Sequence, residues 1–184
     1  MGSALKNITQ TVTSFAITLL ACATAAAMRV VLGLGTSATY DLGPSFSVHK
    51  NGSDQSYTAG SGWVKVTFGS ELFDAANAFN TTNSRFQPNI AGKYLLSAMV
   101  TLYTLTSIGS PCYIALFKNG TVTHYGSNTF IPINGADNRL GISPVVEMNG
   151  STDYYEIFVY TAASSDSAIK GETQNTWFTG CRVG

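Results

Sequence analysis

The chain has 184 residues, which is enough for one domain and an extension. Ten basic and ten acidic residues give a formal net charge of zero, and charged residues make up 11% of the chain, against about 25% in ordinary soluble domains. This composition excludes proteins that use a basic field to attract nucleic acid or an anionic membrane. Because 45% of the residues are hydrophobic, we expect part of the surface to be buried between subunits.

The first forty residues contain an apolar stretch with the composition of a secretory signal peptide. Lys6 supplies one positive charge, Phe15–Ala27 is largely apolar, and the run ATAAA offers small residues for cleavage. Against this interpretation, a single lysine makes a weak n-region, and threonines interrupt the apolar stretch. The stretch is also too short to span a membrane. A signal peptide therefore stays open as an alternative.

A glycine pair follows this stretch and matches the start of a nucleotide-binding turn. Gly33, Gly35 and Ala38 fit G-x-G-x-x-A after an apolar run. Phosphate binding there requires a long helix whose N-terminal amides face the anion. Asp41–Pro44 would stop any helix within one turn. We therefore set the nucleotide interpretation aside.

The same stretch favours a short helix instead. Good helix formers predict a helix over Leu20–Leu32, with Gly33 or Gly35 at its C-terminal end. Such a helix is too short to be stable alone in water. We therefore expect it to pack against copies of itself or against a docking partner.

The segment SFAITLLACATAAAMRVVLGLGTSAT resembles one that is common in tail-fibre proteins of bacteriophages. In those proteins a phenylalanine and a Leu-Leu pair precede an alanine-rich helix, an arginine and a Leu-Gly-Leu-Gly element. The resemblance implies that Phe15, Leu19 and Leu20 anchor the chain to a virion. The matching residues are Phe15, Leu19, Leu20, Ala25, Ala26, Ala27, Arg29, Leu32, Gly33, Leu34, Gly35, Thr36, Ala38 and Thr39.

From Phe46 onward the sequence predicts a β domain without helices. Short runs rich in Val, Ile, Tyr, Phe and Thr alternate with Asn-Gly, Gly-Ser and Pro turn signals. Many short strands with no helix between them predict a sandwich or jelly roll. The expected strands are Phe46–Lys50, Trp63–Phe68, Lys93–Tyr103, Tyr113–Lys118, Thr121–Thr129, Leu140–Glu147, Tyr154–Thr161 and Trp177–Val183.

The connections between these strands differ in length in a regular way. Tight turns with the sequences PNIAGKY, KNGT and MNGST alternate with the longer links Thr104–Pro111, Pro132–Asn138 and Ala162–Gln174. Because antiparallel strands alternate in direction, every second connection lies at the same end of the domain. We therefore expect the three long links to meet at one end, where binding usually resides.

The β region resembles the C1q/TNF-like jelly roll, especially the version found in phage and bacterial surface proteins. The resemblance rests on the linked order of WVKVTFGSELFDAANAFNTTNSRFQPNIAGKYLLSAMVTL, YIALFKNGTV and TWFTGCRV, and it covers residues 46–184. It implies a sandwich of about ten strands that assembles as a homotrimer, with its long loops facing away from the N-terminal segment. The expected organisation is an anchor over residues 1–44 and a head over residues 45–184.

Polar residues in the long links are the candidate receptor-binding residues. Side chains of this kind suit hydrogen bonding to a saccharide or a protein surface. The candidates are Asn134, Asp137, Asn138 and Arg139 in one loop, and Ser164, Ser165, Asp166, Lys170, Glu172, Thr173 and Gln174 in another.

No catalytic constellation is present in the sequence, so we expect no enzymatic activity and no cofactor. His49 and His124 are interpreted as structural residues. Loop carboxylates such as Asp137, Asp166 and Glu172 leave Ca²⁺ binding open.

Asparagine in Asn-Gly pairs and cysteine each allow more than one interpretation. The Asn-Gly pairs at 51, 119 and 149 are interpreted as turns rather than glycosylation sites. Cys22, Cys112 and Cys181 have no metal-binding spacing, and a disulfide between Cys112 and Cys181 stays open.

These observations favour a trimeric phage virion protein, a tail fibre, whose N-terminal segment attaches it to other virion proteins. Its C1q-like head would bind a host surface glycan or protein. We expect it neither to bind nucleic acid nor to insert into a membrane. The alternatives are a capsid-attached head fibre or decoration protein, and a secreted bacterial C1q-like adhesin.

Overall fold

The structure is a computed structural model that describes residues 14, 16–33, 43–58, 60–104, 108–133, 135–163 and 167–184. The chain divides into two compact units, Met1–Asp41 and Leu42–Gly184. Within the described residues, no helix has the length and apolar character needed to cross a membrane.

The described residues of the N-terminal unit form two short helical segments, and a break before α2 interrupts the helix that the sequence predicted over Leu20–Leu32. Residues 16–20 are helical, and α2 (Ala25–Val31) begins after a break. The break occurs because the Thr24 side chain accepts a hydrogen bond from the backbone N–H of Ala27 at 3.1 Å and so starts a new helix. Gly33 follows α2 with a φ of 66°, which confirms the predicted glycine stop.

The three expected anchor residues fall in or beside the first helical segment. Leu20 is 84% exposed and Leu19 is half-buried, whereas Phe15 lies outside the described residues. An exposed leucine on a helix this short is free to pack against another chain. Anchoring itself stays a prediction.

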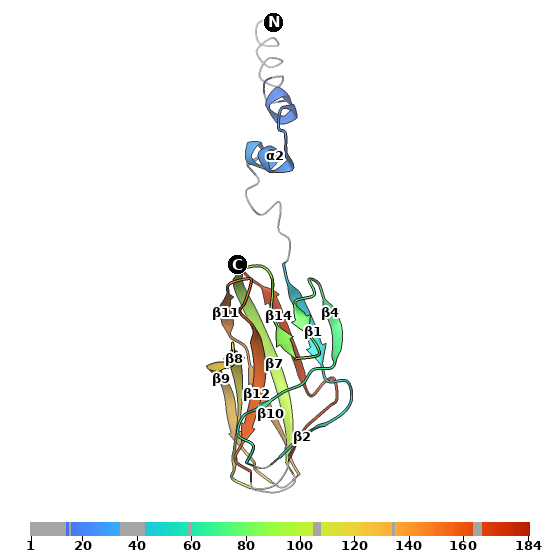
Figure 1. Cartoon of the computed structure of the whole chain (residues 1–184), viewed down its shortest axis with the longest axis vertical. Helices are drawn as coiled ribbons and strands as arrows, with labels where there is room; N and C mark the ends of the chain where they lie inside the picture. The colour runs from blue at the N-terminus through green and yellow to red at the C-terminus, as the bar shows by residue number, and fades with distance from the viewer. Residues whose placement is uncertain are drawn as a thin grey trace, which may run out of the picture. The chain divides into compact units, whose positions relative to one another are not determined.

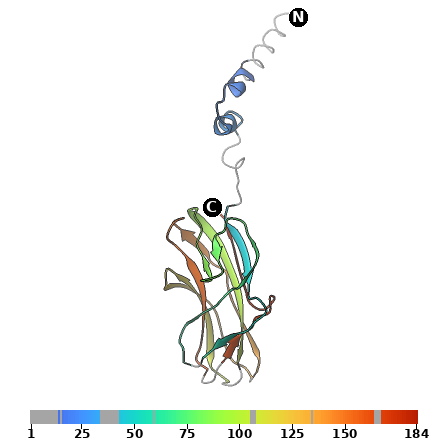
Figure 2. The ribbon, with the colours of Figure 1, turned by 45° about the vertical axis from the view of Figure 1, so that its right-hand side comes forward.

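The second unit, called the β domain below, is a sandwich of two antiparallel sheets, whose strands run along its length (Figures 1 and 2). Sheet A joins β2-β13-β7-β14-β1-β4, with β10 and β11 on the other side of β7; sheet B joins β5-β6-β12-β8-β9, with β3 beside β12. The strands are β1 (Ser45–His49), β2 (Gln55–Tyr57), β3 (Val64–Lys65), β4 (Ser70–Asp74), β5 (Phe79–Asn80), β6 (Arg85–Phe86), β7 (Gly92–Thr104), β8 (Pro111–Lys118), β9 (Thr121–Phe130), β10 (Asp137–Ile142), β11 (Val145–Met148), β12 (Tyr155–Thr161), β13 (Ser167–Ile169) and β14 (Trp177–Arg182).

Most of the expected long strands are confirmed, but the strand expected over Trp63–Phe68 is reduced to the two residues of β3. Two further expectations are wrong. The strand predicted over Leu140–Glu147 is two strands, β10 and β11, separated by Ser143 and Pro144, because proline has no N–H to continue the ladder. The link predicted over Ala162–Gln174 contains β13, which pairs with β7 and β2. This third link is therefore much shorter than expected.

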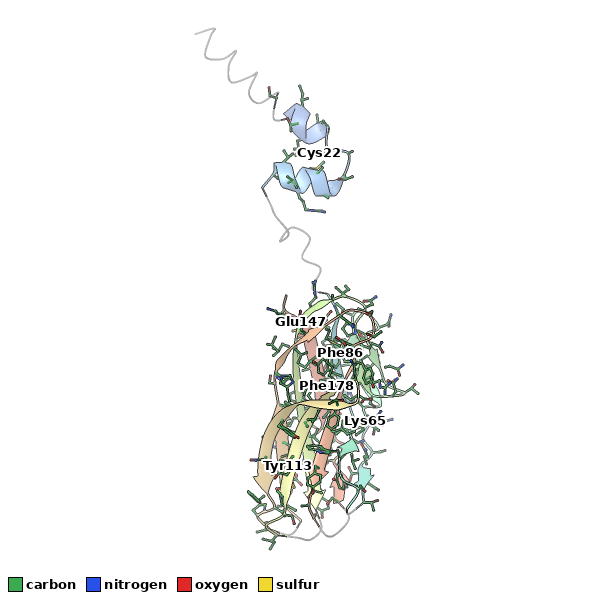
Figure 3. The ribbon with its side chains drawn as sticks, turned by 60° about the vertical axis from the view of Figure 1, so that its left-hand side comes forward. Cys22, Lys65, Phe86, Tyr113, Glu147 and Phe178 are labelled. Atoms are coloured by element: carbon green, nitrogen blue, oxygen red, sulfur yellow. The ribbon has the colours of Figure 1, made fainter. Side chains whose placement is uncertain are left out.

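The core between the sheets is built around stacked phenylalanines. Phe46 on β1 stacks on Phe86 with ring centroids 4.4 Å apart and meets Phe178 edge-on at 4.9 Å. Figure 3 labels Phe86 and Phe178, the two rings that contact Phe46. A Cβ atom at Gly180 would lie 2.7 Å from the Phe46 ring and 2.6 Å from Leu96. Glycine is therefore required there for the ring to approach the strand.

One end of the β domain, called the turn end, carries the tight turns and the points where the chain enters and leaves. The backbone N–H of Arg182 donates to Pro44, and that of Lys93 donates to Gly184. Asn119 and Gly120 join β8 to β9 with φ values of 53° and 81°, as expected for an Asn-Gly hairpin. The C-terminus marks this end in Figure 1.

The cysteines do not pair. Cys112 lies in the core on β8, whereas Cys181 is exposed on the outward side of β14. The disulfide that the sequence left open is therefore absent, since the two thiols belong to different sheets and point in different directions.

Candidate functional site

The described parts of the three long links lie at the end of the β domain opposite the turn end, called the loop end below (Figure 1). The backbone N–H of Gly109 donates to Ile131 at 2.9 Å, and that of Ile131 donates to Ser110 at 3.1 Å. The third link is held at its start, where the N–H of Ala162 donates to Pro111 at 3.1 Å. The predicted convergence of the long links is confirmed.

Exposed apolar side chains gather at the loop end. Ile108 in the first link is 63% exposed, Phe130 at the end of β9 is 62% exposed and Ile133 in the second link is 63% exposed. The hydrogen bonds of Gly109 and Ser110 to Ile131 join these two parts of the chain. Sequence reasoning missed them because it searched these loops for polar groups. Apolar anchors of this kind supply most of the binding energy in protein interfaces.

The charged candidates lie on the side of the loop end, on the outward face of sheet A. Asp137 at the start of β10 and Lys170 after β13 form an ion pair at 2.9 Å. The Lys170 ammonium also lies 5.5 Å from the centre of the Tyr103 ring. The hydrogen bond to Asp137 raises the pKa of Lys170. These groups form a polar rim beside the apolar residues.

Lys170, Glu172 and Gln174 are not in the same loop as Ser164–Asp166, because β13 separates the two segments. The N–H of Gly171 donates to Asp54 at 2.7 Å and holds the segment against residues 51–54. Glu172 accepts a hydrogen bond from the side chain of Asn175, whose amide oxygen in turn accepts from Arg139 at 3.4 Å. The segment extends the rim along sheet A rather than over the loop tips.

The other candidates divide into three groups. Arg139, Thr173 and Gln174 are exposed. Asn138 is 4% exposed, and its amide donates to Ala136 at 3.2 Å, so it belongs to the interior and not to the exposed set. Asn134 and Ser164–Asp166 lie outside the described residues.

A second apolar surface covers the outward face of sheet A. Leu95 on β7 lies between Val145 on β11 and Cys181 on β14. Four residues further along β7, on the same face, Met99 pairs with Trp177. Val145 is 56% exposed. A hollow of about 400 Å³ opens beside Met99 and Trp177. This face offers apolar contact area to a second copy of the chain.

The described residues show no cluster of three or more His, Cys, Asp or Glu that could hold a metal ion. Asp137 faces Lys170 rather than another carboxylate, and Asp166 lies outside the described residues. His49 Nδ1 donates to the backbone oxygen of Lys50 at 2.6 Å, and His124 contacts the Thr123 hydroxyl, consistent with local structural roles. Calcium binding stays a prediction.

The β domain has the C1q/TNF-like jelly-roll fold. The globular domain of zebrafish complement 1qA matches with a TM-score of 0.53 and 18% identity, over 77% of this chain and 98% of that one. Murine APRIL matches with a TM-score of 0.55 and 11% identity, over 77% and 99%. Eiger TNF from S. frugiperda matches with a TM-score of 0.55 and 9% identity, over 77% and 94%. The predicted fold class is confirmed.

No protein-family model matches the chain. The uncharacterized protein YqcC of Bacillus subtilis (strain 168) is 30% identical over 111 residues, which cover 58% of this chain and 30% of that protein. The chain therefore spans less than a third of the length of this relative. Neither result assigns an activity.

Proposed function

We propose that this protein is a non-enzymatic binding module that recognises a cell-surface receptor through its loop end. The observation that carries the proposal is the loop end itself, where Ile108, Phe130 and Ile133 stand exposed beside the ion pair of Asp137 and Lys170. An apolar centre with a polar rim is the usual composition of a protein-binding surface. The rigid sandwich behind it holds the loops in place.

The module acts as a homotrimer in this proposal. The C1q/TNF family that the sequence resembles is generally trimeric, and the outward face of sheet A supplies apolar side chains such as Leu95, Met99 and Val145 for contact between copies. Three copies raise the strength of a weak receptor contact through effective concentration. Light scattering of the full chain should give three times the mass of one chain, and a stable monomer would contradict the trimer.

The finer proposal is a phage virion fibre that is attached by its N-terminal segment. Its support is the sequence similarity over Phe15–Thr39, together with Leu20, which is 84% exposed and so free for docking. Immunogold labelling of intact particles would locate the protein. Label on the tail supports a tail fibre, label on the capsid supports a head fibre or decoration protein, and its absence from particles contradicts both.

A secreted bacterial adhesin is the second candidate, because the curated relative comes from a bacterium and the small residues Ala23–Ala27 suit cleavage. N-terminal sequencing of the native protein distinguishes the two. A mature N-terminus near Met28 would support the adhesin and exclude anchoring through Phe15, Leu19 and Leu20.

The receptor site is tested with paired substitutions of exposed apolar residues. Ile108→Ser with Ile133→Ser should weaken binding to susceptible cells, within a panel of bacterial strains that includes Bacillus subtilis, by at least about tenfold. The matched control is Leu72→Ser, because Leu72 is 66% exposed but lies on β4, away from the loop end. Equal binding by both variants would show that the loop end does not bind the receptor.

A further inference from the structure

The outward face of sheet B carries aromatic side chains at neighbouring positions on three strands. Tyr160 on β12 pairs with Tyr113 on β8, which pairs with Asn128 on β9. In the next row, Phe158 pairs with Ala115, which pairs with Tyr125. Figure 3 shows Tyr113 in the half of the domain nearer the loop end.

Trp63, which precedes β3, is fixed among these rings. Its ring centre lies 5.6 Å from that of Tyr160, 5.7 Å from that of Phe117 and 6.0 Å from that of Tyr125. Tyr113 lies 5.8 Å from Tyr160 in turn. Rings at these separations hold one another in place, so the cluster is formed before any ligand arrives.

An irregularity in β9 brings Tyr125 and Asn128 to the same face. Residues three apart on a regular strand point to opposite faces. Here the pairing shifts between Tyr113 and Ala115, so that Gly126 and Ser127 together oppose Ile114. A bulge of this kind redirects side chains, and bulges are frequent beside functional sites. Gly126 permits it, because a Cβ there would lie 2.6 Å from Ile114 and from the backbone oxygen of Gly141.

These residues line a hollow of about 440 Å³ that is open to solvent on one side. Its lining, within the part of the chain that the structure describes, is Trp63, Tyr113, Tyr125, Gly126, Asn128 and Tyr160, none of which is charged. Charged groups on the same sheet are bonded to one another: Glu156 accepts from Lys65 at 3.1 Å and from Arg85 at 2.7 Å. The hollow therefore presents flat rings, phenol hydroxyls, an indole N–H and one amide.

We propose that this aromatic hollow binds a neutral saccharide of one or two rings. A pyranose has a face of C–H bonds that can lie on an aromatic ring and a rim of hydroxyls that need donors and acceptors. Tyr125, at 67% exposed, supplies the ring, and the Asn128 amide with the Tyr113 and Tyr160 hydroxyls supplies hydrogen bonds. Ligand pockets span about 300–1,000 Å³, so this hollow suits a small sugar.

The lining favours a neutral sugar over other ligands. A nucleic acid or a phosphorylated ligand would find no cation in the hollow to pair with its charge. An extended peptide requires partners for its backbone along a groove, whereas this hollow is compact and has one amide. The site lies outside the loop end, so it goes beyond the receptor site proposed above.

The test uses the fluorescence of Trp63 in the full chain. The sequence has two tryptophans, so Trp177→Phe leaves Trp63 as the only indole. Methyl glycosides of glucose, galactose, mannose and N-acetylglucosamine, with cellobiose, lactose and diacetylchitobiose, are titrated to high millimolar concentration. At least one should change the fluorescence in a saturable way. Tyr125→Ala should weaken that binding by at least about tenfold, and Tyr125→Phe should retain most of it.

The control is Phe73→Ala, because Phe73 is a 52% exposed aromatic residue on β4 of the other sheet and its loss should leave sugar binding unchanged. Thermal unfolding confirms that each variant is folded. The proposal is overturned if no sugar binds, if binding survives Tyr125→Ala, or if an oligoproline peptide binds here and the sugars do not. The result is separate from that of Ile108→Ser with Ile133→Ser, which leaves the hollow intact.

Discussion

At the turn end of the β domain, polar side chains close the turns by bonding to backbone, whereas at the loop end apolar side chains stand exposed. The Asn149 carboxamide oxygen accepts from the N–H groups of Ser151 and Thr152 at 3.0 Å and of Asp153 at 3.1 Å. At the loop end, Ile108 and Ile133 are each 63% exposed. The contrast indicates that stability is concentrated where the chain enters and leaves, and that the other end is free to vary for binding.

The largest expected effect is the difference in free energy of unfolding between a Phe→Ala substitution in the core and one at the loop end. Phe86→Ala removes a fully buried ring that stacks on Phe46, and it should lower the free energy of unfolding by about 3–5 kcal/mol. Phe130→Ala, at a 62% exposed position, should change it by about 0.5 kcal/mol or less. Urea denaturation measures both. Similar losses would mean that the loop end is packed as tightly as the core.

The second-largest expected effect is the difference in stability between Gly→Ala substitutions at two glycines of sheet A. Gly180→Ala places a methyl group 2.7 Å from the Phe46 ring and should lower the free energy of unfolding by about 1–3 kcal/mol through overpacking. Gly141→Ala on β10 is the matched control, because its nearest neighbour would be 3.9 Å away. Thermal and urea unfolding of both variants check this. Equal stability of the two variants would contradict the proposed role of Gly180.

A smaller effect comes from the Asp153 carboxylate at the turn end. Burial alone would raise its pKa, but hydrogen bonds from Lys118, Asn119 and the N–H of Asn149 outweigh burial and leave the pKa below its ordinary value of 3.8. The unfolded chain therefore takes up the proton first. The stability that Asp153 contributes is complete well above pH 3.8 and is lost as the pH falls through the lower pKa of the folded state.

Asp153→Asn should therefore cost about 1 kcal/mol at neutral pH and flatten the fall in stability below pH 3.8. Urea denaturation across acidic and neutral pH measures this. Asp137→Asn is the control, because that carboxylate lies in an exposed pair beside the loop end. If Asp153→Asn retained the full acid dependence of the unaltered protein, Asp153 would not be its source.

The smallest expected effect on stability is that of the rim ion pair. Lys170→Ala should leave the melting temperature unchanged, because exposed ion pairs contribute little to folding. It should nevertheless weaken cell binding if the rim contacts the receptor. Asp137→Lys with Lys170→Asp reverses the pair, and recovery of binding in this double variant would show that the pairing, rather than the sign of either charge, matters.

The sequence was sufficient to predict the long strands and the placement of the loops. Runs rich in Val, Ile, Tyr, Phe and Thr between turn signals mark β7, β8, β9 and β12, and parity then places every second connection at one end. The two- and three-residue strands, such as β5 and β13, are too short to give such a signal. The break before α2 depends on the Thr24 cap, whose signal lay inside a run of helix-forming residues.

The candidate sites were less predictable for a physical reason. The loop-end residues Ile108, Phe130 and Ile133 have no periodic pattern, so only the fold shows that they are exposed together. The aromatic hollow depends on a bulge that sets Tyr125 and Asn128 on one face, where regular alternation would have separated them. A search for aromatic residues spaced two or four apart on β8 and β12 could have found Tyr113, Phe117, Phe158 and Tyr160.

The hydrogen bonds of Arg182 to Pro44 and of Lys93 to Gly184 place the first and last residues of the β domain at the same end of the sandwich. A domain whose entry and exit share one end can be transplanted through a junction confined to that end. Recombination at that junction would exchange the whole β domain while leaving the sequence of the N-terminal unit as it was. An engineered graft at Gly43 and Pro44, with a fluorescent protein placed before it, would leave the loop end and the aromatic hollow untouched.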